Sequence, residues 1–315
     1  MRDGRSESET ALPRARPVAC LAPMRWLFLF LLAGCAASTT GTSSEEVVRG
    51  VAADARGDAV VRLEIDHAEN GTKELCSGTL LAPDVVLTAR HCLAVRDLAQ
   101  PRPACRAGSW VDTPDSAYVG NVAPGAIHVI IGRSIATDPS GGVVGGAAAP
   151  SFDGAPVAAV GTRIVDDGAG EMCGHDVAVI VLDHAVDAPT TSIREAPPVV
   201  GEKLTAVGWG RTENGYPLAK QMRTGIPVLA VGAGLFTYTR ASGAVLSAAL
   251  VDGELAVGES VCNGDSGGPL LDDAGMVVGV VSRTVQNGSV RCVDTPVVYS
   301  QASAWRGLTG RTAGR

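Results

Sequence analysis

The octet at residues 262–269, CNGDSGGP, is the most informative stretch of this 315-residue chain. Glycines on both sides of Ser266 permit a tight turn that exposes the serine hydroxyl and leaves backbone N–H groups free to face one point. Such converging donors make an oxyanion hole, which stabilises negative charge that develops on a carbonyl oxygen. A glycine-rich hairpin with an inert serine is the alternative, and it would be favoured if the chain offered no base elsewhere.

His91 and Asp176, both far upstream in the sequence, could activate that serine. His91 follows an apolar run of strand length, and Cys76 lies close enough in sequence to cross-link Cys92 beside it. Asp176 stands at the start of another apolar run, where it could be buried and could fix the tautomer of an imidazole. Alone, the histidine would be structural or exposed and the aspartate would satisfy strand-start N–H groups. Together with Ser266 they predict a catalytic triad.

Composition limits the class of protein. Hydrophobic residues make up 46% of the chain and charged residues 19%, which suits a globular protein with a large core rather than a disordered polyelectrolyte. The formal net charge is −7, and no dense Lys/Arg run occurs, so nucleic acid is not an expected partner.

Short apolar runs predict an all-β fold. Val61, Leu63 and Ile65 alternate with polar residues, which is typical of a half-buried strand. Other runs of strand length occupy residues 85–88, 127–131, 177–182, 204–207 and 276–281. The pattern fits antiparallel barrels or a sandwich and does not separate the two.

The N-terminal region resembles an export signal. Residues 26–33 form an apolar run that follows arginines and precedes small residues, and it is far shorter than the roughly 20 residues of a membrane-spanning helix. Residues 32–35, LAGC, resemble a bacterial lipobox, which would place a lipid on Cys35. Cleavage after Ala36 or Ala37 and a coincidental match are the alternatives. Met24 is a second candidate for the translation start.

These features give three expected segments: a signal peptide or lipobox region at 1–35, a flexible tether or propeptide at 36–46 and a folded domain at 47–315. The chain is expected to be exported, and either lipid-anchored at the cell envelope or secreted. Six cysteines lie beyond residue 75 without a C-x-x-C pair, which fits three disulfides in an oxidising compartment. Free buried thiols are the alternative. The six are Cys76, Cys92, Cys105, Cys173, Cys262 and Cys292.

The chain resembles the chymotrypsin-like (trypsin-like, S1 family) serine proteases. The order His91, Asp176, Ser266 and the octet around the serine are those of the family. Further matches are VVRG at 47–50, CSGTL at 76–80, GWG at 208–210 and TPVVY at 295–299. The resemblance implies two six-stranded antiparallel β-barrels with the active site in the cleft between them.

The resemblance also implies a mechanism for a serine endopeptidase. His91 takes a proton from Ser266, which attacks a peptide carbonyl, while Asp176 orients the imidazole. The N–H groups of Gly264 and Ser266 hold the oxyanion, and one such donor is worth about 3 kcal/mol in the transition state. No metal or cofactor is expected, the substrates are proteins or peptides, and the protein is expected to be a monomer. A catalytically idle binding module is the alternative, and metal-dependent hydrolysis is a weaker one.

Other features are carried over from the family. Disulfides between Cys76 and Cys92 and between Cys262 and Cys292 match the family pattern. Cys105 and Cys173 are the remaining pair, which we expect to be bonded beside Asp176.

Activation in the family frees the amino group of the residue matching Val47, which pairs with the acid matching Asp265. A cut there would also separate the domain from a lipid on Cys35, so anchoring and activation conflict. Aligned on Ser266, Ser260 lies at the base of the specificity pocket, where an aspartate would select Arg or Lys. Its expected walls are Ser282, Thr284 and Val297, so cleavage is expected after small aliphatic residues.

Overall fold

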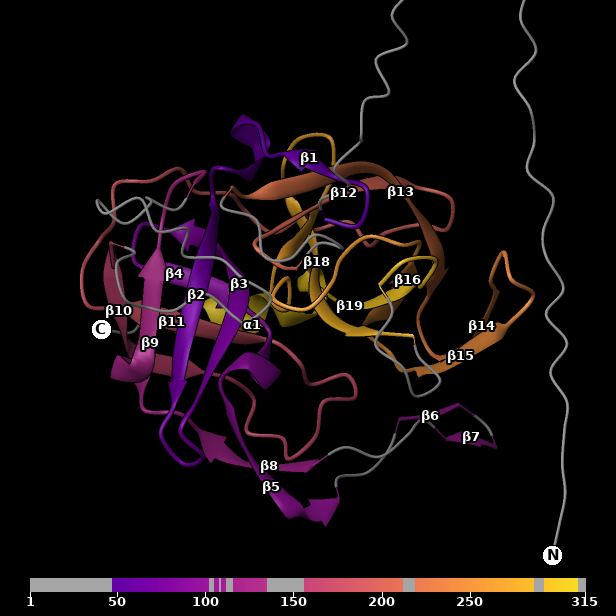
Figure 1. The fold of residues 1–315 in the computed structure, drawn as a ribbon, viewed down its shortest axis with the longest axis horizontal. Coiled ribbons are helices and arrows are strands. Elements are labelled where there is room, and N and C mark those ends of the chain that lie inside the picture. The colour runs from indigo at the N-terminus through magenta and orange to yellow at the C-terminus, as the bar shows by residue number, and fades with distance from the viewer. Residues whose placement is uncertain are drawn as a thin grey trace, which may run out of the picture. The chain divides into compact units, whose positions relative to one another are not determined.

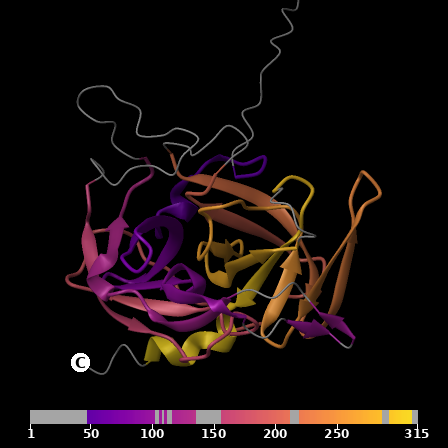
Figure 2. The same cartoon turned by 60° about the horizontal axis from the view of Figure 1, so that its bottom comes forward.

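Most of the apolar runs form strands of two β-barrels, which lie side by side in Figures 1 and 2. The computed structural model describes residues 47–101, 105–107, 109–111, 116–134, 156–211, 219–285 and 292–310, which belong to the unit Ser43–Arg315. The expected signal segment, the candidate lipid site at Cys35 and the tether at 36–46 lie outside the described residues.

The first barrel is closed by six antiparallel strands in the order β10-β11-β4-β3-β2-β9. They are β2 (Val60–His67), β3 (Thr72–Ala82), β4 (Val85–Thr88), β9 (Ile127–Ile130), β10 (Ala159–Val165) and β11 (Ala178–Leu182). Every residue of β4 and β11 is buried, because these two strands pack into the barrel core and also face neighbouring parts of the fold.

The second barrel follows the order β13-β12-β17-β18-β19-β16 and closes through pairing of β13 with β16. Its strands are β12 (Lys203–Gly208), β13 (Gln221–Val231), β16 (Glu254–Val257), β17 (Pro269–Leu271), β18 (Val277–Thr284) and β19 (Val297–Gln301). The short strand β1 (Val51–Ala52) pairs with the outer edge of β13. The predicted architecture, all-β with two six-stranded antiparallel barrels, is confirmed.

Smaller elements decorate the barrels. They are the ladders β5 (Ala94–Pro101) with β8 (Ser116–Asn121), β6 (Arg106–Ala107) with β7 (Trp110–Val111) and β14 (Gly234–Thr239) with β15 (Val245–Leu250), the 3₁₀ turns η1 (Ala55–Gly57), η2 (Arg90–Cys92), η3 (Pro124–Ala126) and η4 (Ala302–Trp305), and the helix α1 (Arg306–Gly310). Strand β15 contacts β6 and β7. Within the described ranges, no helix has the length and apolar character needed to cross a membrane.

Strand β2 differs from its expected half-buried state. Arg62 and Glu64, predicted to face solvent, are each 1% exposed and form an ion pair with each other. Burial raises the pKa of Glu64 to about 7, although the positive charge of Arg62 opposes that rise. Pairing therefore lets polar residues occupy buried positions that an alternating pattern assigns to solvent.

Three disulfides join the pairs that the sequence analysis expected: Cys76 with Cys92, Cys105 with Cys173 and Cys262 with Cys292. The second bond ties the segment that contains β6 and β7 to the loop that precedes β11. That loop also carries Asp176, so the bond fixes the chain close to a candidate catalytic residue.

Candidate active site

Two strands of the first barrel bring His91 and Asp176 together. Strands β4 and β11 are antiparallel neighbours, and Thr88 at the end of β4 pairs with Ala178 at the start of β11. His91, three residues after the end of β4, therefore lies near Asp176, two residues before the start of β11. The backbone N–H of His91 donates to Asp176 Oδ1 at 2.8 Å, and His91 Nδ1 lies 2.8 Å from Asp176 Oδ2.

The surroundings of this pair favour a charged Asp176 carboxylate beside a protonated His91. Burial opposes the charged form of each group, but the opposite charge and the hydrogen bonds between them outweigh it. The pKa of His91 therefore lies above its ordinary value, and that of Asp176 lies below it. The pair can stabilise an imidazolium that forms when His91 takes up a proton.

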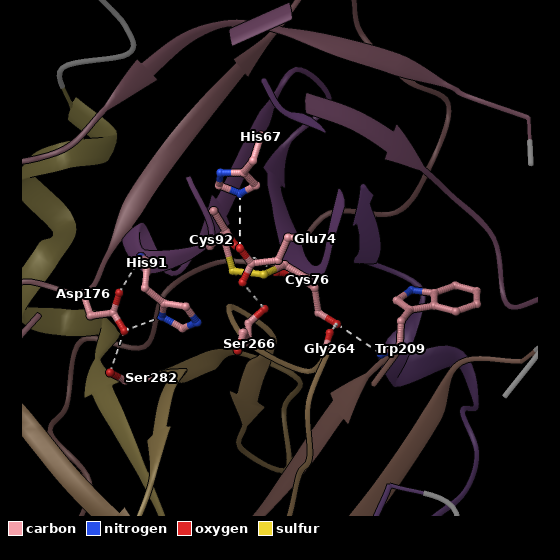
Figure 3. The surroundings of a disulfide bond; sticks show 12 residues. His67, Glu74, Cys76, His91, Cys92, Asp176, Trp209, Gly264, Ser266 and Ser282 are labelled. Carbon is pink, nitrogen blue, oxygen red and sulfur yellow. Dashed lines mark hydrogen bonds and ion pairs between the residues drawn. A yellow bond between two sulfur atoms is a disulfide. The ribbon is translucent and has the colours of Figure 1, made fainter. Parts of the chain in front are cut away.

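Ser282 links this pair to the second barrel. It lies in β18, and its hydroxyl donates to Asp176 Oδ2 at 2.6 Å in a buried contact. The sequence analysis expected Ser282 as a pocket wall and gave its hydroxyl no role; the hydroxyl faces the aspartate (Figure 3). A charged acceptor makes this a strong hydrogen bond, which helps to keep Asp176 ionised.

Ser77 of β3 holds the loop around Ser266 against the first barrel. Its backbone N–H donates to the carbonyl of Ser266 at 2.8 Å, and its hydroxyl donates to the carbonyl of Gly264 at 3.1 Å. The same hydroxyl accepts the N–H of Trp209 at 3.0 Å. Gly267 is required in this loop, since it has φ 80° and an added Cβ would lie 2.1 Å from Thr88 Oγ1.

Ser266 lies beside the His91–Asp176 pair. The Sγ of Cys92 is 3.7 Å from the Ser266 carbonyl oxygen, and the Cys76 and Cys92 sulfurs lie within 4.8 Å of a His91 ring nitrogen. Figure 3 shows the side of the ring away from Asp176 directed toward Ser266. Ser266 is half-buried, and among the described residues its hydroxyl forms no hydrogen bond, including none to His91.

The serine loop also offers two backbone donors. Gly264 has φ 95°, and the intervening N–H of Asp265 donates to Cys262 O at 3.1 Å. Among the described residues, the N–H groups of Gly264 and Ser266 have no acceptor. Unpaired N–H groups two residues apart on a tight loop are the chemistry of an oxyanion hole.

Asp265, the residue between those two donors, is fully buried. Its carboxylate accepts the N–H of Gly210 at 2.7 Å and that of Cys262 at 2.9 Å. Burial raises its pKa to about 7 despite these two donors, and no cationic side chain of the described residues pairs with it. Val47 is also buried, in the apolar cluster that contains Val261. In the intact chain Val47 carries no free amino group.

The expected specificity-pocket residues cluster in the second barrel. Ser260 is fully buried, and its hydroxyl lies 3.2 Å from that of Tyr299. Thr284 of β18 and Val297 of β19 pair directly across the ladder, so their side chains lie close together on one face. No negative charge stands at Ser260 to receive a basic side chain.

The sequence analysis missed an ion pair between Arg283 of β18 and Glu254 of β16. Arg283 reaches the fully buried Glu254, with Nη2 2.9 Å from Oε2. Glu254 also accepts the N–H of Gly174 at 3.2 Å, two residues before Asp176. No sequence motif marks this pair, because it joins segments far apart in the chain.

Metal-dependent hydrolysis, the weaker alternative, would draw on His67, His128, His175 and His184, and these four do not form one cluster in the described part of the chain. His67 lies between Glu69 and Glu74, at 2.8 and 3.2 Å, whereas His175 and His184 each pair with a different aspartate. Among the described residues, His91 lies close to the sulfurs of Cys76 and Cys92, but these two sulfurs are bonded to each other in a disulfide.

Comparison with known proteins identifies relatives of this arrangement. The sequence model of the Trypsin family matches residues 126–305, more than half of the chain. The chain is 29% identical to phenoloxidase-activating factor 1 of Holotrichia diomphalia over 65% of its length, and it spans only 52% of that protein. It is 33% identical to trypsin alpha-3 of Lucilia cuprina (42% of this chain, 79% of that protein). It is 25% identical to chymotrypsin-like elastase family member 3B of Macaca mulatta (78% of this chain, 84% of that protein).

Proposed function

The chain belongs to the trypsin family of serine proteases, and we propose that it is an endopeptidase that works through an acyl-enzyme intermediate. One observation carries this proposal: His91 Nδ1 lies 2.8 Å from Asp176 Oδ2, and this pair from the first barrel lies beside Ser266 from the second (Figure 3). Because Asp176 occupies Nδ1 of the ring, the basic lone pair is left on Nε2, which is directed toward the serine.

The reaction follows from these roles. His91 Nε2 takes the Ser266 proton as Oγ bonds to the carbonyl carbon, and the N–H groups of Gly264 and Ser266 receive the oxyanion. The imidazolium then protonates the leaving amine as the C–N bond breaks, and water hydrolyses the ester by the reverse sequence. Each oxyanion donor contributes about 3 kcal/mol to lowering the barrier.

Cleavage after small aliphatic residues is the proposed specificity. A neutral Ser260 gives no charge to bind Arg or Lys, and the cross-strand pair Thr284 and Val297 leaves little room for an aromatic ring. One methylene changes discrimination by about 1–3 kcal/mol, so the selectivity should be modest.

Activation is proposed to require a cut before Val47. The buried carboxylate of Asp265 has no cation from the described side chains, and a new ammonium at Val47 would supply one. The residue before the cut is Glu46, which does not suit the small aliphatic preference proposed above, so a Glu-specific protease is expected to make the cut. The peptidase domain is then 47–315, released from an exported precursor that a lipid on Cys35 would otherwise anchor.

Labelling with a fluorophosphonate, combined with amino-terminal sequencing of the labelled form, tests the proposal. We expect label on Ser266 in protein that begins at Val47, and no label in Ser266→Ala. Absence of label from correctly cut protein would instead favour a binding module built on the same fold.

A further inference from the structure

Arg90, the residue before His91, is a buried cation. Its side chain is 4% exposed, and its guanidinium lies 3.6 Å from both Asp166 and Asp167. It also donates to the carbonyl of Ala169 and lies over the ring of Tyr118, 5.4 Å from the centroid. A buried guanidinium needs such partners, so this contact set is an integral part of the turn that carries His91.

His175, the residue before Asp176, reaches the same acidic loop. Its Nδ1 lies 2.5 Å from Asp167 Oδ2, while Arg90 approaches Asp167 Oδ1. The neighbours of the proposed base and of the proposed acid therefore meet on the two oxygens of one carboxylate. Asp167 forms an outer bridge that runs parallel to the direct contact between His91 and Asp176.

The loop holds Asp167 in place. Asp167 Oδ1 accepts the N–H of Ala169 at 3.0 Å, and Asp166 Oδ1 accepts that of Gly168 at 2.6 Å. Asn121 of β8 donates to Asp166 Oδ2 at 2.5 Å. These local hydrogen bonds help to hold the Asp167 carboxylate in place beside Arg90 and His175.

We propose that Asp167 is a positioning residue, which sets the spacing of His91 and Asp176 by holding Arg90 and His175. This inference rests on the proposed function, because the pair needs a set spacing only if His91 acts as a base. A displacement of about 1 Å at a reacting group can cost a factor of about 100 in rate. The structural alternative is an ion pair that stabilises the loop without affecting the site.

The test compares Asp167→Asn with a matched control on the same barrel. Asp183 and His184 also form an aspartate–histidine pair, at 3.0 Å, at the far end of β11, so Asp183→Asn removes a similar pair away from the site. We expect Asp167→Asn to lower kcat about ten-fold or more with KM within about two-fold, and Asp183→Asn to leave both unchanged. His175→Gln should have the same effect as Asp167→Asn, and the double variant should be no slower than either.

A second measurement does not need turnover. The amide proton of His91 donates to Asp176, so its exchange with solvent reports their contact directly. In a Ser266→Ala background we expect Asp167→Asn to speed that exchange about ten-fold or more, and Asp183→Asn to leave it unchanged.

Equal kcat in Asp167→Asn and wild type, an equal loss in Asp183→Asn, or a loss of kcat without faster exchange at His91 would each overturn the inference. An inactive, unlabelled wild type would instead reject the proposed function, and the exchange rates alone would then decide the role of Asp167.

Discussion

Before cleavage, the buried carboxylate of Asp265 should make the intact chain less stable as pH rises. Its pKa is about 7 in the folded chain, against 3.8 when it is fully solvated. A carboxyl with a raised folded pKa binds its proton more tightly in the folded state. Its contribution to stability is therefore complete below pH 3.8 and is lost as pH rises through 7.

The magnitude follows from the same shift. At about 1.4 kcal/mol per pKa unit, the full loss is about 4 kcal/mol, of which about 3 kcal/mol falls between pH 5 and 9. Asp265→Asn removes the titration. The amide keeps one of the two acceptors for Gly210 and Cys262, so we expect a cost of about 1 kcal/mol for the other.

The assay is guanidinium unfolding followed by circular dichroism, from pH 5 to 9, on the uncut chain carrying Ser266→Ala to prevent self-cleavage. The free energy of unfolding should fall by about 3 kcal/mol more in this chain than in the chain that also carries Asp265→Asn. Glu64 titrates near the same pH, but it is present in both proteins, so the difference isolates Asp265. Parallel pH profiles in the two chains would refute the reasoning.

Cleavage before Val47 supplies a further contrast. A new ammonium beside Asp265 would lower the carboxyl pKa, so the cut chain should no longer lose this contribution as pH rises from 3.8 to about 7. A cut chain with the same downward slope as the intact chain would show that the amino group does not reach the carboxylate.

Three other predictions concern the site and its supports. Ser282→Ala removes the O–H donor to the buried Asp176 carboxylate, and since hydrogen bonds to charged groups are worth about 1.5–3 kcal/mol, the unfolding free energy should fall by about that amount. If the bond also holds Asp176 against His91, kcat/KM of the folded variant should fall by a factor of about ten or more, and equal kcat/KM in variant and wild type would reject that role. The double variant Thr284→Gly with Val297→Gly should accept Phe or Tyr before the scissile bond, and a peptide library with an unchanged preference would contradict the proposed pocket. The double variant Cys105→Ser with Cys173→Ser should lose about 4 kcal/mol of stability on the chain-entropy model, measured by denaturant unfolding, and an equal midpoint would reject that estimate.

The barrel strands were the most predictable part of the fold. The run at 85–88 has the same bounds as β4, and the runs at 127–131 and 177–182 differ from β9 and β11 by one residue at one end. The runs of β4 and β11 are continuously apolar because every residue of these two strands is buried. The hairpin of β14 and β15 was not predicted. Its apolar residues, including the exposed Leu235 and Val245, do not follow the two-residue period of a half-buried strand.

The site was predictable only where a motif marks it. The structure brings His91 and Asp176 into contact beside Ser266, as the order of motifs indicated, and their catalytic roles stay predictions. Ion pairs such as that of Arg90 with Asp167 carry no local signature, because their partners come from distant loops. Arg62 was predicted to face solvent, and this was wrong. Its ion pair with Glu64 allows it to be buried despite its charge.

The division of the site between the barrels has a consequence for biosynthesis. His91 and Asp176 arrive with the first barrel, whereas Ser266 and Ser282 arrive with the second, whose last strand ends at Gln301. A chain still emerging from a ribosome or a translocation pore therefore holds a base without its nucleophile. If the proposed function holds, such a chain cannot cleave itself or its surroundings until the segment that carries Ser266 has been delivered and folded.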